Sequence, residues 1–169
     1  LRSNFWLTIH VLTITLSYGA FALATGLAHF LIIRSLRSHS LPSADDSWVL
    51  HLYRCLQIGV LLLAAGVILG GVWANYSWGR FWDWDPKETW ALIALLSYVI
   101  LLHGRLGGWC GGYGLAVGSI ACFLTILMAW YGVNFVLGKG LHSYGFGNGG
   151  QLYVGAFASL ELIVLVLAL

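Results

Sequence analysis

Five long apolar stretches limit what this chain can fold into. They cover about residues 5–33, 48–73, 86–103, 115–137 and 151–169. A hydrocarbon core about 30 Å thick is crossed by a helix of roughly 20 apolar residues, and each stretch is close to that length or longer. Only helices and closed barrels satisfy the backbone in lipid, and these stretches lack the alternation of barrel strands. The sequence therefore predicts an all-α integral membrane protein, a bundle of about five transmembrane helices forming one domain over residues 1–169.

The composition supports this class and excludes others. Hydrophobic residues make up 60% of the chain and charged residues 8%, whereas soluble domains carry about a quarter charged residues. The formal net charge of +2, without a basic cluster, predicts no nucleic-acid partner. Cys55, Cys110 and Cys122 are scattered and form no CxxC pair, so we expect packing residues rather than a disulfide framework or a metal site.

The start of the chain carries no targeting pattern. It begins with Leu1 and shows no basic segment followed by a cleavage site, so we expect no signal peptide. The sequence also shows no internal repeat. We interpret it as part of a longer protein in which further helices come first.

The number of crossings fixes which residues share a membrane face. His10 lies near the start of the first span, the aromatic segment 75–88 follows two crossings later, and His142 follows after two more. These three therefore face the same side. The basic residues divide equally between the two sides, with Arg34, Arg37, Arg54 and Arg105 on one and Arg2, Arg80, Lys87 and Lys139 on the other. We place the 34–47 link and Arg105 in the cytoplasm, because two basic residues of the second group lie inside the aromatic segment, where a specific role is plausible.

The most unusual segment is residues 78–90, which hold four of the nine tryptophans among ionisable side chains. One interpretation is an interfacial aromatic belt, although belts usually place one or two Trp or Tyr residues near a span end. The alternative is a flat aromatic surface for a large planar ligand with anionic substituents, which Arg80 or Lys87 could pair with. Within this segment, Asp85, Pro86 and Glu88 also have the spacing of a capping box that starts the third helix.

Haem fits this description, because it is planar, carries two propionates and takes axial imidazoles on its iron. His10 and His142 are the candidate axial pair, and the alternative is that each is an ordinary interfacial histidine. His142 lies in the glycine-rich segment 138–145, whose backbone can approach a ligand closely.

Other polar residues near or within the spans have more than one interpretation. His103, at the far end of the third span, fits a relay site for haem arriving from the cytoplasm or a residue that caps the helix C-terminus. His29, His39 and His51 are expected to be solvated or to reach the interface. Glu161, in the middle of the fifth span, costs about 2.5–3.5 kcal/mol there and needs a partner on another helix or a role such as proton relay. Gly66-x-x-x-Gly70 predicts close helix packing.

Residues 73–92 resemble the tryptophan-rich "WWD" motif of the haem-handling proteins of cytochrome c maturation. The run Asp85-Pro86-Lys87-Glu88-Thr89-Trp90 is similar to the CcsA (ResC) branch of that group. The resemblance extends to the histidine helix around His10, to His103-x-Arg105 and to the loop around His142. It covers about residues 5–150.

The resemblance implies haem b bound on the outer face between His10 and His142. It implies a haem platform formed by Trp78, Trp82, Trp84, Asp85 and Trp90, with Arg80, Asp83 and Lys87 among the cofactor-binding residues. His103 would belong to a cytoplasmic-side site where haem enters, whose second histidine the family supplies from an earlier helix. The implied partners are a CcsB (ResB)-type membrane subunit and an apocytochrome c with a CxxCH motif, in the bacterial inner membrane or the thylakoid membrane.

Three functions remain open from the residues. The first is haem delivery for covalent attachment to apocytochrome c, as a component of a haem lyase complex. The second is a membrane haem protein for electron transfer to quinone, which usually shows histidine pairs within the bundle. The third is a small-solute transporter with an aromatic gate and Glu161 as its coupling residue, which would purify colourless.

Overall fold

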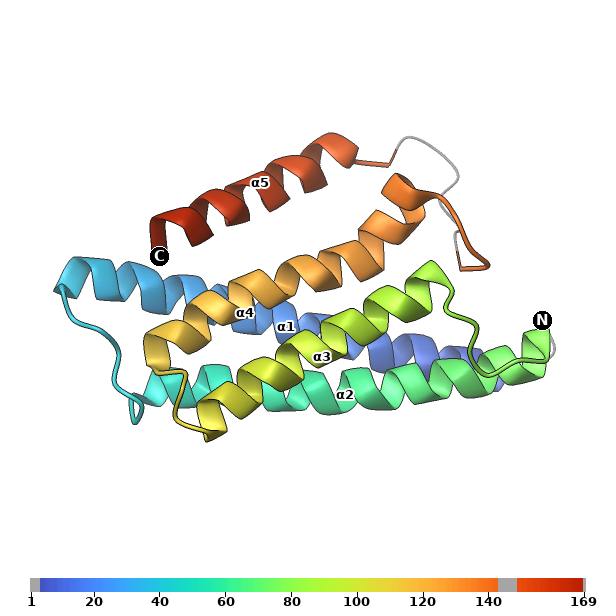
Figure 1. Cartoon of the computed structure of the whole chain (residues 1–169), viewed down its shortest axis with the longest axis horizontal. Helices are drawn as coiled ribbons and strands as arrows, with labels where there is room; N and C mark the ends of the chain where they lie inside the picture. The colour runs from blue at the N-terminus through green and yellow to red at the C-terminus, as the bar shows by residue number, and fades with distance from the viewer. Residues whose placement is uncertain (1–3, 143–148, 169) are drawn as a thin grey trace.

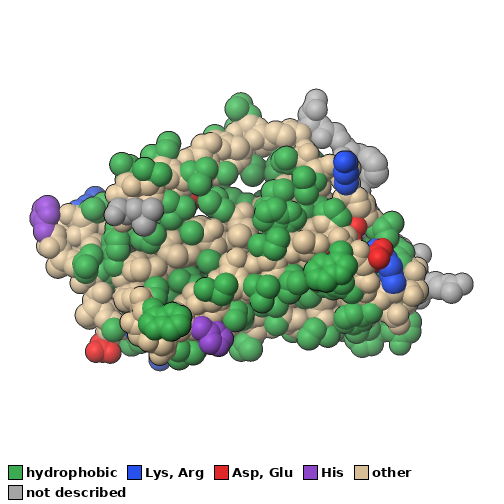
Figure 2. All heavy atoms as spheres, in the orientation of Figure 1, with side chains coloured by type: hydrophobic (Ala, Val, Ile, Leu, Met, Phe, Trp, Pro, Cys, Tyr) green, Lys and Arg blue, Asp and Glu red, His purple; other side chains and the backbone are tan. Residues whose placement is uncertain are grey.

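The computed structural model describes residues 4–142 and 149–168, which form an antiparallel helical bundle (Figure 1). The elements are α1 (Asn4–Ser38), α2 (Ser47–Trp78), α3 (Pro86–Leu106), α4 (Gly112–Leu127), the π-helical η1 (Met128–Leu137) that continues α4, and α5 (Gln151–Ala168). Within the described ranges, five helical spans are long and apolar enough to cross a membrane. In Figure 2, hydrophobic side chains cover the middle of the visible face, and charged ones lie mostly toward its two ends. The predicted all-α membrane class is confirmed.

The first two helices are longer than the sequence predicted. The α1 helix continues to Ser38, and α2 continues through Trp78, so the aromatic segment begins as helix. The α2 helix ends where Gly79 adopts φ 75° and donates its N–H to the Asn75 carbonyl at 3.0 Å. Glycine takes this left-handed conformation without the penalty that a Cβ brings, which is why the helix stops there.

Both helix starts that follow a polar link are capped by an aspartate. Asp46 accepts a hydrogen bond from the Trp48 N–H at 2.9 Å, and the hydrogen bond from Arg34 lowers the pKa of the Asp46 carboxyl. The predicted capping box at α3 is confirmed, with Asp85 accepting from the Lys87 N–H and Glu88 accepting from the Asp85 N–H. The Asp85 cap fixes where the link from α2 meets the bundle.

The α1 and α2 helices pack closely along a glycine-lined contact. A Cβ placed on Gly66 would lie 2.6 Å from a side-chain carbon of Ile14, and one on Gly70 would lie 2.7 Å from Cε1 of His10. The predicted close packing at Gly66 and Gly70 is therefore confirmed. Deeper in the bundle, Phe21 of α1 stacks on Tyr98 of α3 with ring centroids 3.8 Å apart.

The α5 helix is the least embedded element. Figure 1 shows it lying along α4, away from α2 and α3, and Glu161 is its one buried residue among those described. The Glu161 carboxyl lies 3.0 Å from Nε2 of His29 on α1, so the expectation that Glu161 has a partner on another helix is confirmed. His29, which we expected to be solvated or to reach the interface, is half-buried, with its side chain 30% exposed and its Nε2 in contact with Glu161. His39 and His51 are exposed, as predicted.

The three cysteines are free, with no disulfide among the described residues. The described part of the chain also contains no group of three or more His, Cys, Asp or Glu residues placed to hold a metal ion. Cys55, Cys110 and Cys122 are half-buried and pack against the hydrophobic core, which agrees with the interpretation of them as packing residues.

Candidate functional site

A cavity of about 320 Å³ opens at the end of the bundle where α1 starts, α2 ends and α3 starts. Its wall is mainly apolar and aromatic, with a few polar groups. The lining includes His10 and Tyr18 from α1, Trp73 from α2, Phe81 and Trp82 from the following link, Lys87 from α3, Trp130 from η1, and His142. The structure therefore brings together two histidines that are more than a hundred residues apart in the sequence.

His10 is held by the backbone of α2. Its Nδ1 lies 2.8 Å from the Gly66 carbonyl oxygen, which can only accept, so Nδ1 carries the hydrogen. The ring rests against Gly70, where a larger residue would collide with it. Because Nδ1 carries the hydrogen, Nε2 of His10 has the free lone pair. None of the described residues makes a hydrogen bond to it.

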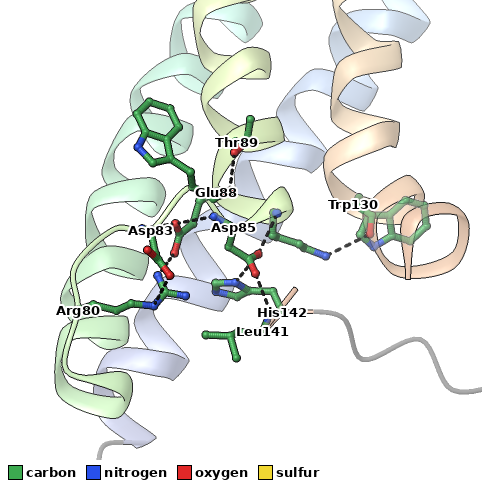
Figure 3. Close-up of polar contacts among 10 residues, drawn as sticks. Arg80, Asp83, Asp85, Glu88, Thr89, Trp130, Leu141 and His142 are labelled. Carbon is green, nitrogen blue, oxygen red and sulfur yellow. Dashed lines mark hydrogen bonds and ion pairs between the residues drawn. The ribbon is translucent and has the colours of Figure 1, made fainter. Parts of the chain in front are cut away.

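His142 is held by the buried carboxylate of Asp85, as Figure 3 shows. Its Nδ1 lies 3.0 Å from Asp85 Oδ1, while Asp85 Oδ2 accepts the Leu141 N–H at 2.6 Å. Gly140 adopts φ 95°, and a Cβ there would collide with this carboxylate. The arrangement orients His142 through Nδ1 and leaves its Nε2 free, as for His10.

Two tryptophans of α2 pack against the His142 ring. Trp78 meets it edge-on with centroids 4.8 Å apart, and the Trp73 centroid lies 6.1 Å away. Trp73 is 2% exposed and lines the cavity, and its indole N–H has no hydrogen-bond partner among the described residues. The site thus contains one unsatisfied buried donor.

Only some of the other predicted site residues line the cavity. Trp82 and Lys87 do, and Lys87 Nζ also donates to the Trp130 carbonyl oxygen at 3.3 Å. Asp85 is directed at His142 and the start of α3, and it is absent from the lining. Trp84 is 67% exposed and Trp90 is half-buried outside the lining.

The predicted cation Arg80 is already paired. Its guanidinium donates to Glu88 at 3.1 Å, lies 3.4 Å from Asp83, and sits over the Trp78 ring at 5.5 Å. Figure 3 shows Arg80 and Asp83 together on the link that leads to α3. Of the two cations that the sequence offered for an anionic ligand, Lys87 is therefore the one at the cavity.

His103 lies at the opposite end of the bundle. Its Nδ1 is 2.8 Å from the Val99 carbonyl oxygen one turn earlier, and its side chain is exposed. It shares no cavity with His10 and His142 in the described structure. Its role at a site where haem enters remains a prediction.

Sequence reasoning did not select Trp73, Phe81, Tyr18 or Trp130 for the site. Trp73 and Phe81 lie within the tryptophan-rich segment 73–92, so their position in that segment could have identified them as site residues. Tyr18 and Trp130 come from distant spans, and no local pattern distinguishes them from membrane-facing aromatics.

Comparison with known proteins connects this geometry to a family. Residues 1–142 match the sequence model of the family described as "Cytochrome C assembly protein". The chain belongs to the cytochrome c assembly family. This family membership confirms the predicted resemblance and places the chain in cytochrome c biogenesis.

Several relatives align with most of this chain. Protein NrfI of Wolinella succinogenes is 43% identical over 150 residues, covering 86% of this chain and 16% of its own length. The cytochrome c biogenesis proteins CcsA of Chlamydomonas reinhardtii and of Synechococcus sp. are each 39% identical, covering 88% and 86% of this chain. The aligned regions are 42% and 57% of those two relatives, so the chain spans about half their length or less.

Proposed function

We propose that this chain binds haem b between His10 and His142 and presents it for covalent attachment to apocytochrome c. The observation that supports this most directly is the shared cavity with two imidazoles, each oriented through Nδ1 and free at Nε2. Protein histidines that ligate metals usually donate their other ring N–H to a carbonyl or a carboxylate, and here one of each is present.

The residues around the cavity fit haem. Its volume, about 320 Å³, is at the lower end of the range of roughly 300–1,000 Å³ for ligand pockets, and the lining is mostly apolar and aromatic. Lys87 supplies a cation, and the unpaired Trp73 N–H supplies a donor, for anionic propionates. Trp82 and Phe81 supply aromatic surface for the macrocycle.

The chain's contribution to the reaction is binding and orientation. Haem supplies the vinyl groups that are joined to cysteine thiols. None of the cavity-lining residues that the structure describes is a cysteine, so the reacting thiols would come from the CxxCH motif of the apocytochrome. Holding the reacting groups in place can lower a barrier substantially, by up to about 7–11 kcal/mol in well-oriented cases.

The partners and the location follow from the same proposal. The partners would be a CcsB (ResB)-type membrane subunit and an apocytochrome c with a CxxCH motif. His103 presents a free Nε2 on an exposed surface, which suits a site whose second histidine comes from a further helix. The cavity would face the outer side of a bacterial inner membrane, or the lumen of a thylakoid.

The axial assignment is tested by the absorption spectrum of the purified, detergent-solubilised chain. We expect haem bands in the wild type and their loss in the His10→Ala/His142→Ala double variant, since both Nε2 ligands are gone. His39→Ala is the control, because His39 is exposed in the link after α1. An unchanged spectrum in the double variant overturns the assignment, and a colourless wild type overturns haem binding.

Delivery is tested separately from binding. The chain would be co-expressed with the partner subunit and an apocytochrome c, and covalent haem on the cytochrome would be measured. Haem that stays on this chain while the cytochrome remains unmodified would favour an electron-transfer protein over a delivery protein.

A further inference from the structure

His29 of α1 and Glu161 of α5 form a second polar cluster, separate from the cavity. Neither residue lines that cavity, and the pair lies within two membrane-spanning helices. His29 Nε2 and Glu161 Oε2 are 3.0 Å apart. Glu161 is 2% exposed, so its carboxyl is shielded from water, whereas the His29 side chain is 30% exposed.

Glu161 differs from every other acidic residue of the chain in what surrounds it. Asp45 is exposed in the link before α2, while Asp46, Asp83, Asp85 and Glu88 contact arginines or backbone N–H groups. The Glu161 carboxyl contacts no polar group except His29 among the described residues. A buried carboxylate needs several donors to remain ionised, and this one has a single candidate.

The second nitrogen of His29 determines how many protons the pair holds. Nδ1 lies 2.8 Å from the Thr25 carbonyl oxygen, which only accepts, so Nδ1 carries a hydrogen. The neutral imidazole then has a bare lone pair on Nε2, facing Glu161. Two atoms with lone pairs repel at 3.0 Å unless a proton lies between them, so the contact requires one proton.

We propose that His29 and Glu161 form an intramembrane proton-binding site, in which Glu161 is a neutral carboxylic acid that donates its proton to Nε2 of His29. The neutral form separates no charge, whereas moving the proton to His29 would create an imidazolium and a carboxylate in a medium of low dielectric constant. Oε2 has no hydrogen bond of good geometry from the described residues, so the proposal depends on the 3.0 Å approach of His29 Nε2 to Oε2 and on the burial of the carboxyl. The proposal does not depend on haem binding.

Among the described residues, no charged side chain from the neighbouring helices contacts the pair. On α4, the titratable side chains are Tyr113, which donates to the Ala168 carbonyl oxygen at the end of α5, and Cys122, which packs in the core. On α1, the nearest charged residue along the chain is Arg34, and its guanidinium is paired with Asp46. Loss of the shared proton would therefore leave an uncompensated negative charge beside α5.

The site also gives α5 a polar contact with α1, in addition to the hydrogen bond from Tyr113 of α4 to the Ala168 carbonyl oxygen. Glu161 is the one described residue of α5 that is buried, while large apolar side chains of the helix are exposed. A hydrogen bond that cannot be replaced by water is favoured to stay formed in lipid, so the pair would keep α5 beside α1.

The experiment uses the wild-type chain in lipid bilayers with ¹³C-labelled glutamate. The sequence contains only two glutamates, Glu88 and Glu161, so two side-chain carboxyl resonances are expected by NMR. We expect the Glu88 resonance to have the chemical shift of a carboxylate at pH 7, since Arg80 contacts it, and the Glu161 resonance to have that of a protonated acid. Two carboxylate resonances overturn the proposal.

A second measurement assigns the resonance and locates the proton. Glu161→Gln removes the acid signal and keeps a donor for Nε2, with Asp45→Asn as the matched control that leaves it in place. In ¹⁵N-histidine spectra of the wild type, we expect His29 to be protonated at Nδ1 and unprotonated at Nε2. A doubly protonated His29 overturns the proposal, and this outcome needs no variant that could fail to fold.

Discussion

At the scale of single residues, Asp85 joins the most parts of the site. One buried carboxylate caps α3, accepts the Leu141 N–H and orients His142. Its position before Pro86 predicted the cap from sequence alone, because caps depend on neighbours in the chain. Its contact with His142 was not predictable, because that contact joins residues 57 positions apart.

Replacing Asp85 should affect both folding and ligand binding. We expect Asp85→Ala to lower the free energy of unfolding by about 1–3 kcal/mol, since the cap and the acceptor for the buried Leu141 N–H are lost. Under the proposed function, haem affinity should also fall by about 10–100-fold, as for other residues that orient metal-bound histidines. Thermal unfolding and haem titration measure the two effects.

The conservative variant separates these two roles of Asp85. Asn is as good an N-cap as Asp, so Asp85→Asn should recover much of the stability while the loss of negative charge still weakens haem binding. Asp45→Ala serves as the control, because Asp45 is exposed in a link. Normal haem affinity in both Asp85 variants would contradict the role assigned to this carboxylate.

At the scale of helices, most elements were predictable and the details of their ends were not. The apolar stretches gave five spans, because the bilayer requires a length that the sequence displays directly. The extension of α2 to Trp78 was missed, because polar and aromatic residues after Trp73 resemble a link until Gly79 ends the helix. The π-helical turns of η1, which supply Trp130 to the cavity, follow no local pattern that we identified.

The contact between α1 and α2 provides a test at this scale. A methyl group at Gly70 would press on the His10 ring, so Gly70→Ala should cost about 1–3 kcal/mol of stability and displace His10. Gly26→Ala is the matched control, since nothing lies within 4 Å of a Cβ there and alanine favours helix. Thermal unfolding and the haem absorption spectrum of both variants measure the result. Equal thermal stability and equal haem spectra in the Gly70→Ala and Gly26→Ala variants would show that the contact at Gly70 tolerates a larger residue.

At the scale of the whole molecule, an even number of crossings predicted that His10 and His142 share one end of the bundle. The structure places His10 and His142 in the lining of one cavity. The number of crossings puts them on the same side of the membrane but does not require them to be close together. The composition of that cavity was only partly predictable, because Tyr18 and Trp130 reach it through packing of helices distant in sequence.

The proposed orientation can be tested with single cysteines in a chain lacking Cys55, Cys110 and Cys122. Lys139→Cys should react with a membrane-impermeant thiol reagent added outside intact cells or spheroplasts, because its exposed loop lies at the cavity end. Ser43→Cys, in the exposed link between α1 and α2, should react only after permeabilisation. The reverse pattern would place the cavity on the cytoplasmic side.

The anchoring of the two histidines has a mechanical consequence. His10 is fixed to the α1–α2 pair, whereas His142 is fixed through Asp85 to the first turn of α3. The gap between the two imidazoles therefore depends on how far α3 tilts away from that pair. Under the proposed function, such a tilt would weaken both axial bonds to haem at the same time and allow it to leave the cavity.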